Sequence, residues 1–308
     1  MKILVVSPVC PDAVDFLRRQ HDVICAFNAP QDEIQAKIVD RDILVFRSGP
    51  DINAAVMDCA PDLSLLIRAG SGLDNLDIEH AVSRDIALAR IERPGARAVA
   101  ELSFSFMLAL ARQVPKADAM LRQGHWVKHE LTGYLLSGKT LGIFGAGNIG
   151  TQVGQMGAAW GMQVIGCVEH YSENRAVELQ NQGIQLVDTN EVLANADFLS
   201  IHLPLQRSTR NLLDVAALAR MKPSAFLLNL ARGGIVNEQA LLQALTDGKL
   251  AGAGIDVHEH EGEGKVSPLA ELPNVILTPH IGAGTVDTQR AIGQEIIQLI
   301  TAHAATRG

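Results

Sequence analysis

The chain has 308 residues and a formal net charge of −8, with 47% hydrophobic and 19% charged residues. This composition is that of a globular protein, and the length exceeds one ordinary core, so we expect two domains and exclude a disordered chain. The acidic balance, without any basic tract, argues against binding to nucleic acid.

Several features bear on the cellular compartment. The four cysteines are widely spaced and form no CxxC pair, which predicts reduced thiols. No signal peptide precedes the first strand-like run, and no apolar run reaches the ~18 residues that a membrane span needs. We therefore expect a cytoplasmic protein that does not contact membranes.

Short apolar runs alternate with segments of helical period in the first part of the chain. Each run is bounded by polar residues, Gly or Pro, and each gap can hold one helix. The predicted strands span residues 3–6, 23–26, 43–46, 65–67 and 86–89.

The same alternation restarts after one long helical stretch over about 98–123. Asn237 is a good N-cap for a helix that Gly248 would end, and a last amphipathic helix is expected over about 285–303. The predicted strands of this part span residues 141–144, 163–167, 198–202, 226–230, 252–257 and 275–277. The pattern predicts an α/β protein with two doubly wound parallel-sheet domains.

A glycine-rich loop, GAGNIG at residues 145–150, lies between a predicted strand and a predicted helix over 151–160. Gly145 permits a tight turn, Gly147 lets the backbone approach a pyrophosphate, and Gly150 lets the helix pack close to the strand. The helix N-terminus offers free N–H groups to phosphates. The loop predicts a dinucleotide site; the alternative is a strand–helix turn without a ligand.

The acidic residue expected about 20 positions later is Glu169, which follows the next strand. A carboxylate there can accept from both ribose hydroxyls and favours NAD, although a solvated loop glutamate is the alternative. Arg175 is the nearest arginine that could meet a 2′-phosphate, so NADP is not excluded.

Polar residues follow three predicted strands of the second part, at the ends where parallel sheets bind ligands. Arg232, Glu261 and His280 are the candidates for chemistry there. Each alone has a plainer interpretation, as an ion-pairing arginine, a solvated glutamate or a turn histidine.

Segments along nearly the whole chain resemble the D-isomer-specific 2-hydroxyacid dehydrogenase family. Within this family, the chain is most similar to the phosphoglycerate dehydrogenase and hydroxypyruvate reductase branch. The matching segments are RAGSGLDNLD (68–77), AVAELSFSFMLALAR (98–112), GKTLGIFGAGNIG (138–150), HLPL with a later Thr (202–209), NLARGGIVNE (229–238), GIDV with a later Glu (254–261) and PHIGAGT (279–285).

The resemblance implies a Rossmann-type NAD-binding domain, residues 94–283, inserted in a flavodoxin-like substrate-binding domain, residues 1–93 and 284–308. It implies an NAD(H)-dependent D-2-hydroxyacid dehydrogenase or 2-oxo acid reductase, foremost one resembling D-3-phosphoglycerate dehydrogenase. Alternatives are a hydroxypyruvate or glyoxylate reductase, another D-2-hydroxyacid dehydrogenase and, more remotely, an NAD-sensing corepressor without enzymatic activity. A regulatory domain is not expected, because none follows residue 308.

The resemblance also assigns roles. His280 exchanges a proton with the substrate oxygen, Glu261 orients its ring, and Arg232 binds the substrate carboxylate. Asp256 is expected to accept from the nicotinamide carboxamide. The full set of expected cofactor-binding residues is Gly145, Gly147, Asn148, Ile149, Gly150, Glu169, His202, Pro204, Thr209, Ala231, Asp256 and Gly282.

Substrate binding is expected of residues in the first domain as well. These are Arg47, Ser71, Gly72 and Asn75, which act with Arg232 on a small anionic acid. A homodimer is expected through the helix after Val99. Lys128 matches a basic position that in relatives reaches a neighbouring subunit, or it is a solvated charge.

The sequence departs from the family pattern at several points. Loop 94–99 is about two residues shorter than usual, which puts the shape of the pocket in question. His258 replaces the usual Phe, Gly262 replaces a Pro, and Val168 stands where relatives often carry the ribose-binding Asp. A metal site at His258 and His260 is the alternative interpretation, but the spacing matches no known zinc pattern, so we expect no metal.

Overall fold

The structure is a computed structural model and describes residues 1–306. It divides into two compact units, one made of Met1–Gly95 and the segment from Ala283 onward, the other of Ala96–Gly282. The first unit thus joins the two ends of the chain, and the second is one continuous segment between them.

The first unit is a five-stranded parallel sheet in the order β2-β1-β3-β4-β5, which is the flavodoxin-like order. Its strands are β1 (Lys2–Val5), β2 (Asp22–Cys25), β3 (Ile43–Phe46), β4 (Leu65–Arg68) and β5 (Ala87–Arg90). Its helices are α1 (Pro11–Arg18), α2 (Gln31–Ile38), α3 (Ala54–Asp58), α4 (Ile78–Ser83) and α12 (Val286–Ala305).

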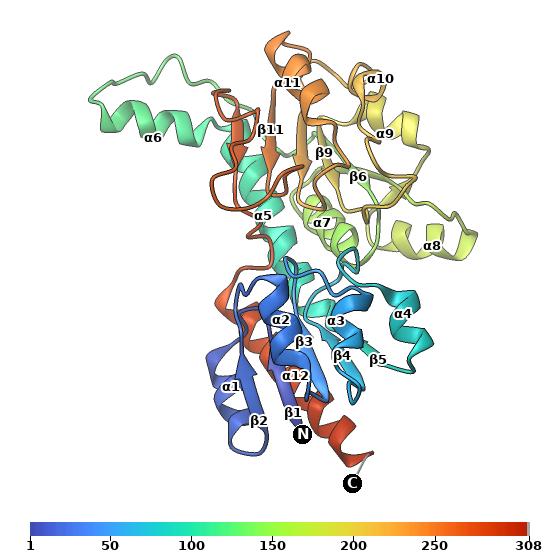
Figure 1. Cartoon of the computed structure of the whole chain (residues 1–308). Helices are drawn as coiled ribbons and strands as arrows, with labels where there is room; N and C mark the ends of the chain where they lie inside the picture. Colours follow the sequence, from blue (N-terminus) through green and yellow to red (C-terminus); the bar gives the residue numbers. More distant parts are fainter. Residues whose placement is uncertain (307–308) are drawn as a thin grey trace. The chain divides into compact units, whose positions relative to one another are not determined.

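Alternate residues of these strands face two different apolar layers. On β3, Leu44 and Phe46 pack in the cluster that holds buried residues of α2, α3 and α4. Ile43 and Val45 face the opposite cluster, which contains Ile296 of α12 and residues of α1. Figure 1 shows α12, in red, lying beside the blue first elements of the chain. Both faces are therefore covered, as parallel sheets require.

The second unit is a seven-stranded parallel sheet in the order β12-β11-β10-β9-β6-β7-β8. Counted from β6, this is the Rossmann order 3-2-1-4-5-6 with one further strand at the edge. Its strands are β6 (Thr140–Phe144), β7 (Gln163–Cys167), β8 (Gln185–Leu186), β9 (Phe198–Ile201), β10 (Phe226–Asn229), β11 (Gly252–Ile255) and β12 (Val275–Leu277). Its helices are α5 (Arg93–Ala111, begun in the first unit), α6 (Val114–Arg122), α7 (Asn148–Ala159), α8 (Glu173–Asn181), α9 (Thr189–Asn195), α10 (Val215–Leu218) and α11 (Glu238–Thr246).

The expected long helix over 98–123 is wrong as a single element, and the expected loop 94–99 is helical, because α5 begins at Arg93. The structure has two helices there, because Gln113 adopts a left-handed conformation with φ 51° that ends the helical path. Pro115 then lies in the first turn of α6, where a missing N–H costs nothing, whereas it would break a helix interior. The two-residue strand β8 was not expected, because a run this short has no periodicity.

The expected helix ends around Asn237 and at the tail are confirmed. The Asn237 side chain accepts from the Ala240 N–H, and Gly248 follows the helix with φ +67°. Thr285 caps α12 by accepting from the Thr288 N–H. In the described part of the chain, no helix is both long and apolar enough to cross a membrane.

Candidate active site

The glycine loop follows β6 and owes its path to two close backbone approaches. A Cβ on Gly145 would lie 2.6 Å from the His202 carbonyl oxygen, and the residue has φ +91°. A Cβ on Gly150 would collide with the Gly145 carbonyl oxygen. Both positions therefore require glycine, so that the loop folds tightly against β9 and α7 packs on it.

Gly147 differs from the other two, because a Cβ there would meet no atom within 4 Å. It is the exposed N-cap of α7, whose first N–H groups and partial positive charge face outward at this point. The open space beside a helix N-terminus fits the pyrophosphate of a dinucleotide. Asn148 and Ile149 form the first turn of this helix.

Arg175, at the start of α8, contributes a cation to the glycine loop. Its Nη2 donates to the Ala146 carbonyl oxygen at 2.6 Å and to Thr151 Oγ1 at 3.2 Å, and its Nη1 pairs with Glu178 at 2.6 Å. From the sequence, Arg175 is only the arginine that lies nearest to Glu169 along the chain. Its contact with the loop depends on how α8 folds back, which the local pattern does not predict.

Glu169 lies exposed after β7, next to the half-buried Val168. Gln206 Nε2 lies 3.3 Å from each of its two carboxylate oxygens. The carboxylate is thus held by a neutral donor that a pair of ribose hydroxyls can replace.

His202 directly follows β9, and its ring is enclosed by protein. Burial lowers the pKa of the imidazole to about 3, so the ring is neutral at physiological pH. Its Nε2 lies 2.8 Å from Ser200 Oγ. Its Nδ1 is buried and has no hydrogen-bond partner within residues 1–306.

The loop after His202 is held together by Thr209. Its hydroxyl donates to the Pro204 carbonyl oxygen at 2.6 Å and accepts from the Gln206 N–H at 2.9 Å. The Thr209 side chain is buried, while Pro204 is exposed. The structure therefore gives Thr209 a part in shaping the loop that presents Pro204.

Arg232 is presented by a turn after β10 that Asn229 organises. The buried amide of Asn229 donates to the Arg232 carbonyl oxygen at 3.0 Å and accepts from the Ala231 N–H at 3.2 Å. Arg232 itself is half-buried, and its Nη1 donates to the Ala231 carbonyl oxygen at 2.7 Å. Its backbone is thus fixed independently of its side chain.

Asp256, at the end of β11, is 1% exposed, and its carboxylate accepts three hydrogen bonds. The donors are Thr278 Oγ1 at 2.6 Å, the Ile281 N–H at 2.8 Å and the Gly282 N–H at 2.8 Å. Three of about four acceptor positions are therefore occupied by the turn after β12. The structure assigns Asp256 to the geometry of that turn, a role the sequence did not predict, and leaves one acceptor position for the expected carboxamide contact.

The same turn carries His280 in a left-handed conformation with φ 54°, rare for a residue other than glycine. Its N–H donates to the Asp256 carbonyl oxygen at 2.8 Å. Its Nδ1 lies 3.0 Å from Glu261 Oε2, with side chains 30% and 42% exposed. The backbone strain is tolerated because the surrounding hydrogen bonds overdetermine the turn.

Two opposing effects act on the Glu261 carboxyl. Partial burial raises its pKa, but the hydrogen bond and charge of His280, with the N–H and charge of His258, outweigh burial and hold the pKa below its ordinary value. His258 donates its N–H to Glu261 Oε1 at 3.2 Å, and its Nε2 lies 3.0 Å from the Thr278 carbonyl oxygen. His258 thus bridges the turn and the carboxylate. Within residues 1–306, no three metal-binding side chains gather into a metal site.

Arg232, Glu261 and His280 follow three strands that are neighbours in the sheet, in the order β12-β11-β10. Because the strands are parallel, all three residues lie at one edge of the sheet, the edge that also carries the glycine loop after β6. Of the three, Glu261 and His280 are in direct contact.

In the first unit, Arg47 follows β3 as a half-buried cation. Its N–H donates to Ser7 Oγ at 2.9 Å. Burial lowers the pKa of its guanidinium, and no side chain within residues 1–306 pairs with it. A half-buried charge without a partner is costly, so an anionic ligand is its natural counterpart.

The loop after β4 lies close to Arg47 in this unit. The Asn75 amide donates to the carbonyl oxygens of Arg47 and Pro50 at 2.9 and 2.6 Å, while its own Oδ1 is buried and unpartnered. Ser71 is exposed and Gly72 half-buried in the same loop. Asn75 thus joins the two segments that carry the expected substrate residues.

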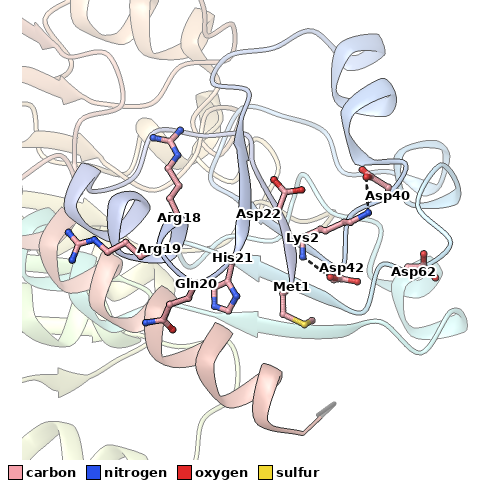
Figure 2. Close-up of a pocket in the computed structure, with 10 residues that line it drawn as sticks. All are labelled: Met1, Lys2, Arg18, Arg19, Gln20, His21, Asp22, Asp40, Asp42 and Asp62. Carbon is pink, nitrogen blue, oxygen red and sulfur yellow. Dashed lines mark hydrogen bonds and ion pairs between the residues drawn. The ribbon is translucent and has the colours of Figure 1, made fainter.

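The opposite edge of this sheet has a hollow of about 730 Å³, shown in Figure 2. Lys2 binds two of its aspartates: the Lys2 ammonium pairs with Asp40 at 3.1 Å, and the Lys2 backbone N–H donates to Asp42 at 2.7 Å. The hollow lies where the strands begin, away from the strand ends that carry Arg47, and we assign it no role.

Comparisons with known proteins agree with this geometry. Residues 104–282 match the family model described as "D-isomer specific 2-hydroxyacid dehydrogenase, NAD binding domain". The chain is 40% identical over 301 residues to a D-3-phosphoglycerate dehydrogenase of Methanocaldococcus jannaschii, covering 97% of this chain and 57% of that protein. It is 34% identical over 302 residues to a hydroxypyruvate reductase of Thermotoga maritima, covering 97% of each.

Among solved structures, a D-lactate dehydrogenase from Aquifex aeolicus, complexed with NAD and lactic acid, has a TM-score of 0.87 at 25% identity. The match covers 99% of this chain and 96% of that one. The chain therefore spans little more than half of its phosphoglycerate dehydrogenase relative but nearly the whole of the hydroxypyruvate reductase.

Proposed function

Because the chain belongs to the D-isomer specific 2-hydroxyacid dehydrogenase family, we propose that it transfers a hydride between NAD(H) and a small anionic 2-hydroxy or 2-oxo acid. The observation that carries the proposal is the His280–Glu261 pair, at the sheet edge that also holds the glycine loop. A proton-transfer pair and a phosphate-binding helix end in one sheet are the two halves that this reaction needs.

In the proposed reduction, His280 gives a proton to the oxygen of the 2-oxo group as the carbon receives a hydride. Glu261, ionised because its pKa is lowered, stabilises the protonated ring and fixes its orientation through Nδ1. The other ring nitrogen, Nε2, is then the atom that donates to substrate. In the oxidation His280 accepts the proton at the same nitrogen.

Arg232 binds the substrate carboxylate through its planar guanidinium and polarises the neighbouring carbonyl. The bound nicotinamide supplies or receives the hydride. The residues proposed to hold its dinucleotide are the loop 145–150, Glu169 and the segments that contain His202, Ala231 and Gly282. Glu169 favours NAD, while Arg175 at the loop leaves a 2′-phosphate acceptable.

For the substrate, we propose a D-3-phosphoglycerate-like acid, with a hydroxypyruvate or glyoxylate reductase as the alternative. The unpaired, half-buried Arg47 supports the first, because a distal phosphate would neutralise it. The full-length match to a hydroxypyruvate reductase supports the second.

Steady-state turnover decides between these substrates. NADH or NADPH oxidation is followed with phosphohydroxypyruvate, hydroxypyruvate, glyoxylate and pyruvate, each at several concentrations. We expect the highest kcat/KM with phosphohydroxypyruvate and NADH. Binding of NADH without turnover of any acid would contradict the proposal and indicate a cofactor-sensing protein instead.

A variant of Arg47 tests how the distal group is recognised. Arg47→Gln should raise KM for phosphohydroxypyruvate about 30-fold, because a charge-assisted contact worth ~2 kcal/mol is lost. KM for glyoxylate, which has no distal group, should stay within twofold and serves as the internal control. An equal rise for both acids would place Arg47 elsewhere in the function.

A further inference from the structure

Two segments of the second unit carry the proposed chemistry but follow different strands. Residues 230–238 follow β10 and contain Arg232, and residues 256–261 follow β11 and contain Glu261. Their positions relative to each other depend on what joins them beyond the ends of the strands.

The two segments touch backbone to backbone at one point. A Cβ on Gly233 would collide with the carbonyl group of His258, so only glycine permits this approach. Gly233 directly follows Arg232, and His258 donates its N–H to Glu261. The contact therefore lies next to both proposed functional side chains.

Beside this contact, Glu238 and Glu259 exchange hydrogen bonds. The Glu238 N–H donates to Glu259 Oε1 at 3.1 Å, and the Glu259 N–H donates to Glu238 Oε1 at 2.8 Å. Each carboxylate thus accepts from the backbone of the other residue. The Glu238 side chain is buried, at 6% exposure, whereas Glu259 is exposed.

The direction of these bonds also suits the local charges. Glu238 is the first residue of α11, so its N–H has no acceptor within the helix, and Asn237 caps a different N–H, that of Ala240. The Glu259 carboxylate satisfies the orphan N–H and lies at the positive end of the helix. The hydrogen bond to this N–H and the positive end of the helix together explain why two acidic residues can lie side by side.

We propose that Glu238 and Glu259 are positioning residues, which lock the Arg232 segment to the Glu261 segment through their reciprocal hydrogen bonds. The role rests on the proposed function, because it concerns the spacing of Arg232 from the Glu261–His280 pair. Neither residue touches substrate in this role. Small displacements of catalytic groups cost one or two orders of magnitude in rate, so the lock has a measurable effect.

Glu259 is the better residue to vary, because its exposed side chain can be removed without opening the core. Glu259→Ala deletes one acceptor, and Glu259→Gln keeps an oxygen that can accept from the same N–H. Glu263→Ala is the matched control, since it removes an equal charge from an exposed position in the same loop. All three variants are compared with wild type, using whichever of the four 2-oxo acids gives wild type the highest kcat/KM.

We expect Glu259→Ala to lower kcat about tenfold, with the Kd for NADH within twofold of wild type. Glu259→Gln and Glu263→Ala should both stay within twofold in kcat, because the hydrogen bond and not the charge positions the segment. The proposal would be overturned if Glu259→Ala had the same kcat as Glu263→Ala. It would also be overturned if the kcat of Glu259→Gln were as low as that of Glu259→Ala.

Hydrogen exchange of the unliganded protein gives a readout independent of activity. The Glu238 amide should exchange at least tenfold faster in Glu259→Ala than in wild type, and at the wild-type rate in Glu259→Gln. Unchanged protection in Glu259→Ala would overturn the lock. If the wild-type protein reduces no acid, the proposed function fails on that result, while the exchange rates still report whether the two segments are locked.

Discussion

At the scale of single residues, the Glu261 carboxylate has two donors on two sides. It accepts from the His258 N–H and lies 3.0 Å from His280 Nδ1, so it fixes a ring orientation and supplies a negative charge. These two contributions can be separated, because a glutamine in its place can still accept hydrogen bonds but carries no charge.

Glu261→Gln should therefore lower kcat/KM for reduction about 100-fold, which corresponds to ~2.7 kcal/mol of transition-state stabilisation. Steady-state kinetics at pH 7 measure this change. A wild-type kcat/KM in Glu261→Gln would show that Glu261 acts by orientation alone.

The lowered pKa of Glu261 also predicts how the pair responds to acid. The group is ionised above the pKa of an ordinary glutamate, where the pair contributes fully to stability, and the contribution is lost as pH falls through the lowered value. Wild type should therefore lose stability relative to Glu261→Gln only on acidification below the ordinary glutamate range. Urea unfolding at pH 7 and pH 3 measures this difference.

Asp256 acts on His280 through the backbone. Asp256→Asn replaces one carboxylate oxygen by an NH2 group, which would face the N–H groups of Ile281 or Gly282 without an acceptor between them. We expect the turn to relax out of the left-handed conformation at His280 and kcat to fall at least tenfold.

The KM for NADH separates two roles of Asp256. A role confined to the turn leaves this KM within threefold, whereas the carboxamide contact expected from sequence would raise it well beyond that. A wild-type kcat in Asp256→Asn would contradict the positioning role.

At the scale of elements, the glycine loop joins β6 to α7. Its three glycines are required for different physical reasons. Gly147→Ala places its methyl in open space, so Tm should stay within about 2 °C while the Kd for NADH rises at least tenfold, because the methyl occupies the approach of the pyrophosphate. Calorimetry and fluorescence titration measure the two quantities.

Gly150→Ala is the matched comparison, because its methyl would collide with the Gly145 carbonyl oxygen. It should lower Tm by several degrees, as backbone clashes at a helix–strand contact cost ~2 kcal/mol or more. A stable Gly150→Ala together with a destabilised Gly147→Ala would reverse the assignment of the two glycines.

Elements with a strong local signal were predictable from the sequence. The strand at Ile43–Phe46 is a continuous run of apolar residues, and Asn237 caps α11 through its own side chain, so the local sequence indicates both elements. The break at Gln113 was missed because a left-handed conformation there has no glycine to announce it.

The residues of the proposed site, Arg232, Glu261 and His280, are predictions from the strand ends and the family pattern. The hydrogen bonds that join the loops around them could not be predicted from the sequence. The reciprocal bonds of Glu238 with Glu259 join residues 21 positions apart, and those of Asp256 join residues up to 26 apart. Such contacts arise only when neighbouring strands bring their loops together, and no local period encodes them.

At the scale of the whole molecule, several large apolar side chains of α6 and of the segment after it are exposed. None of the α6 residues is buried, and Figure 1 shows this helix standing apart from the other elements of its unit. Leu121 is 58% exposed, Trp126 80% and Leu135 72%. Exposed apolar side chains can mark a contact with another protein, and we propose that the partner is a second copy of this chain.

Leu121→Glu combined with Trp126→Glu should convert the proposed dimer into monomers, because each charge would be buried without a partner in the interface. Sedimentation velocity should give twice the mass of one chain for wild type and a single-chain mass for the double variant. Val82→Glu, at a 68% exposed position in the other unit, is the control and should remain dimeric. If wild type sediments as a monomer at micromolar concentration, the proposed dimer is wrong.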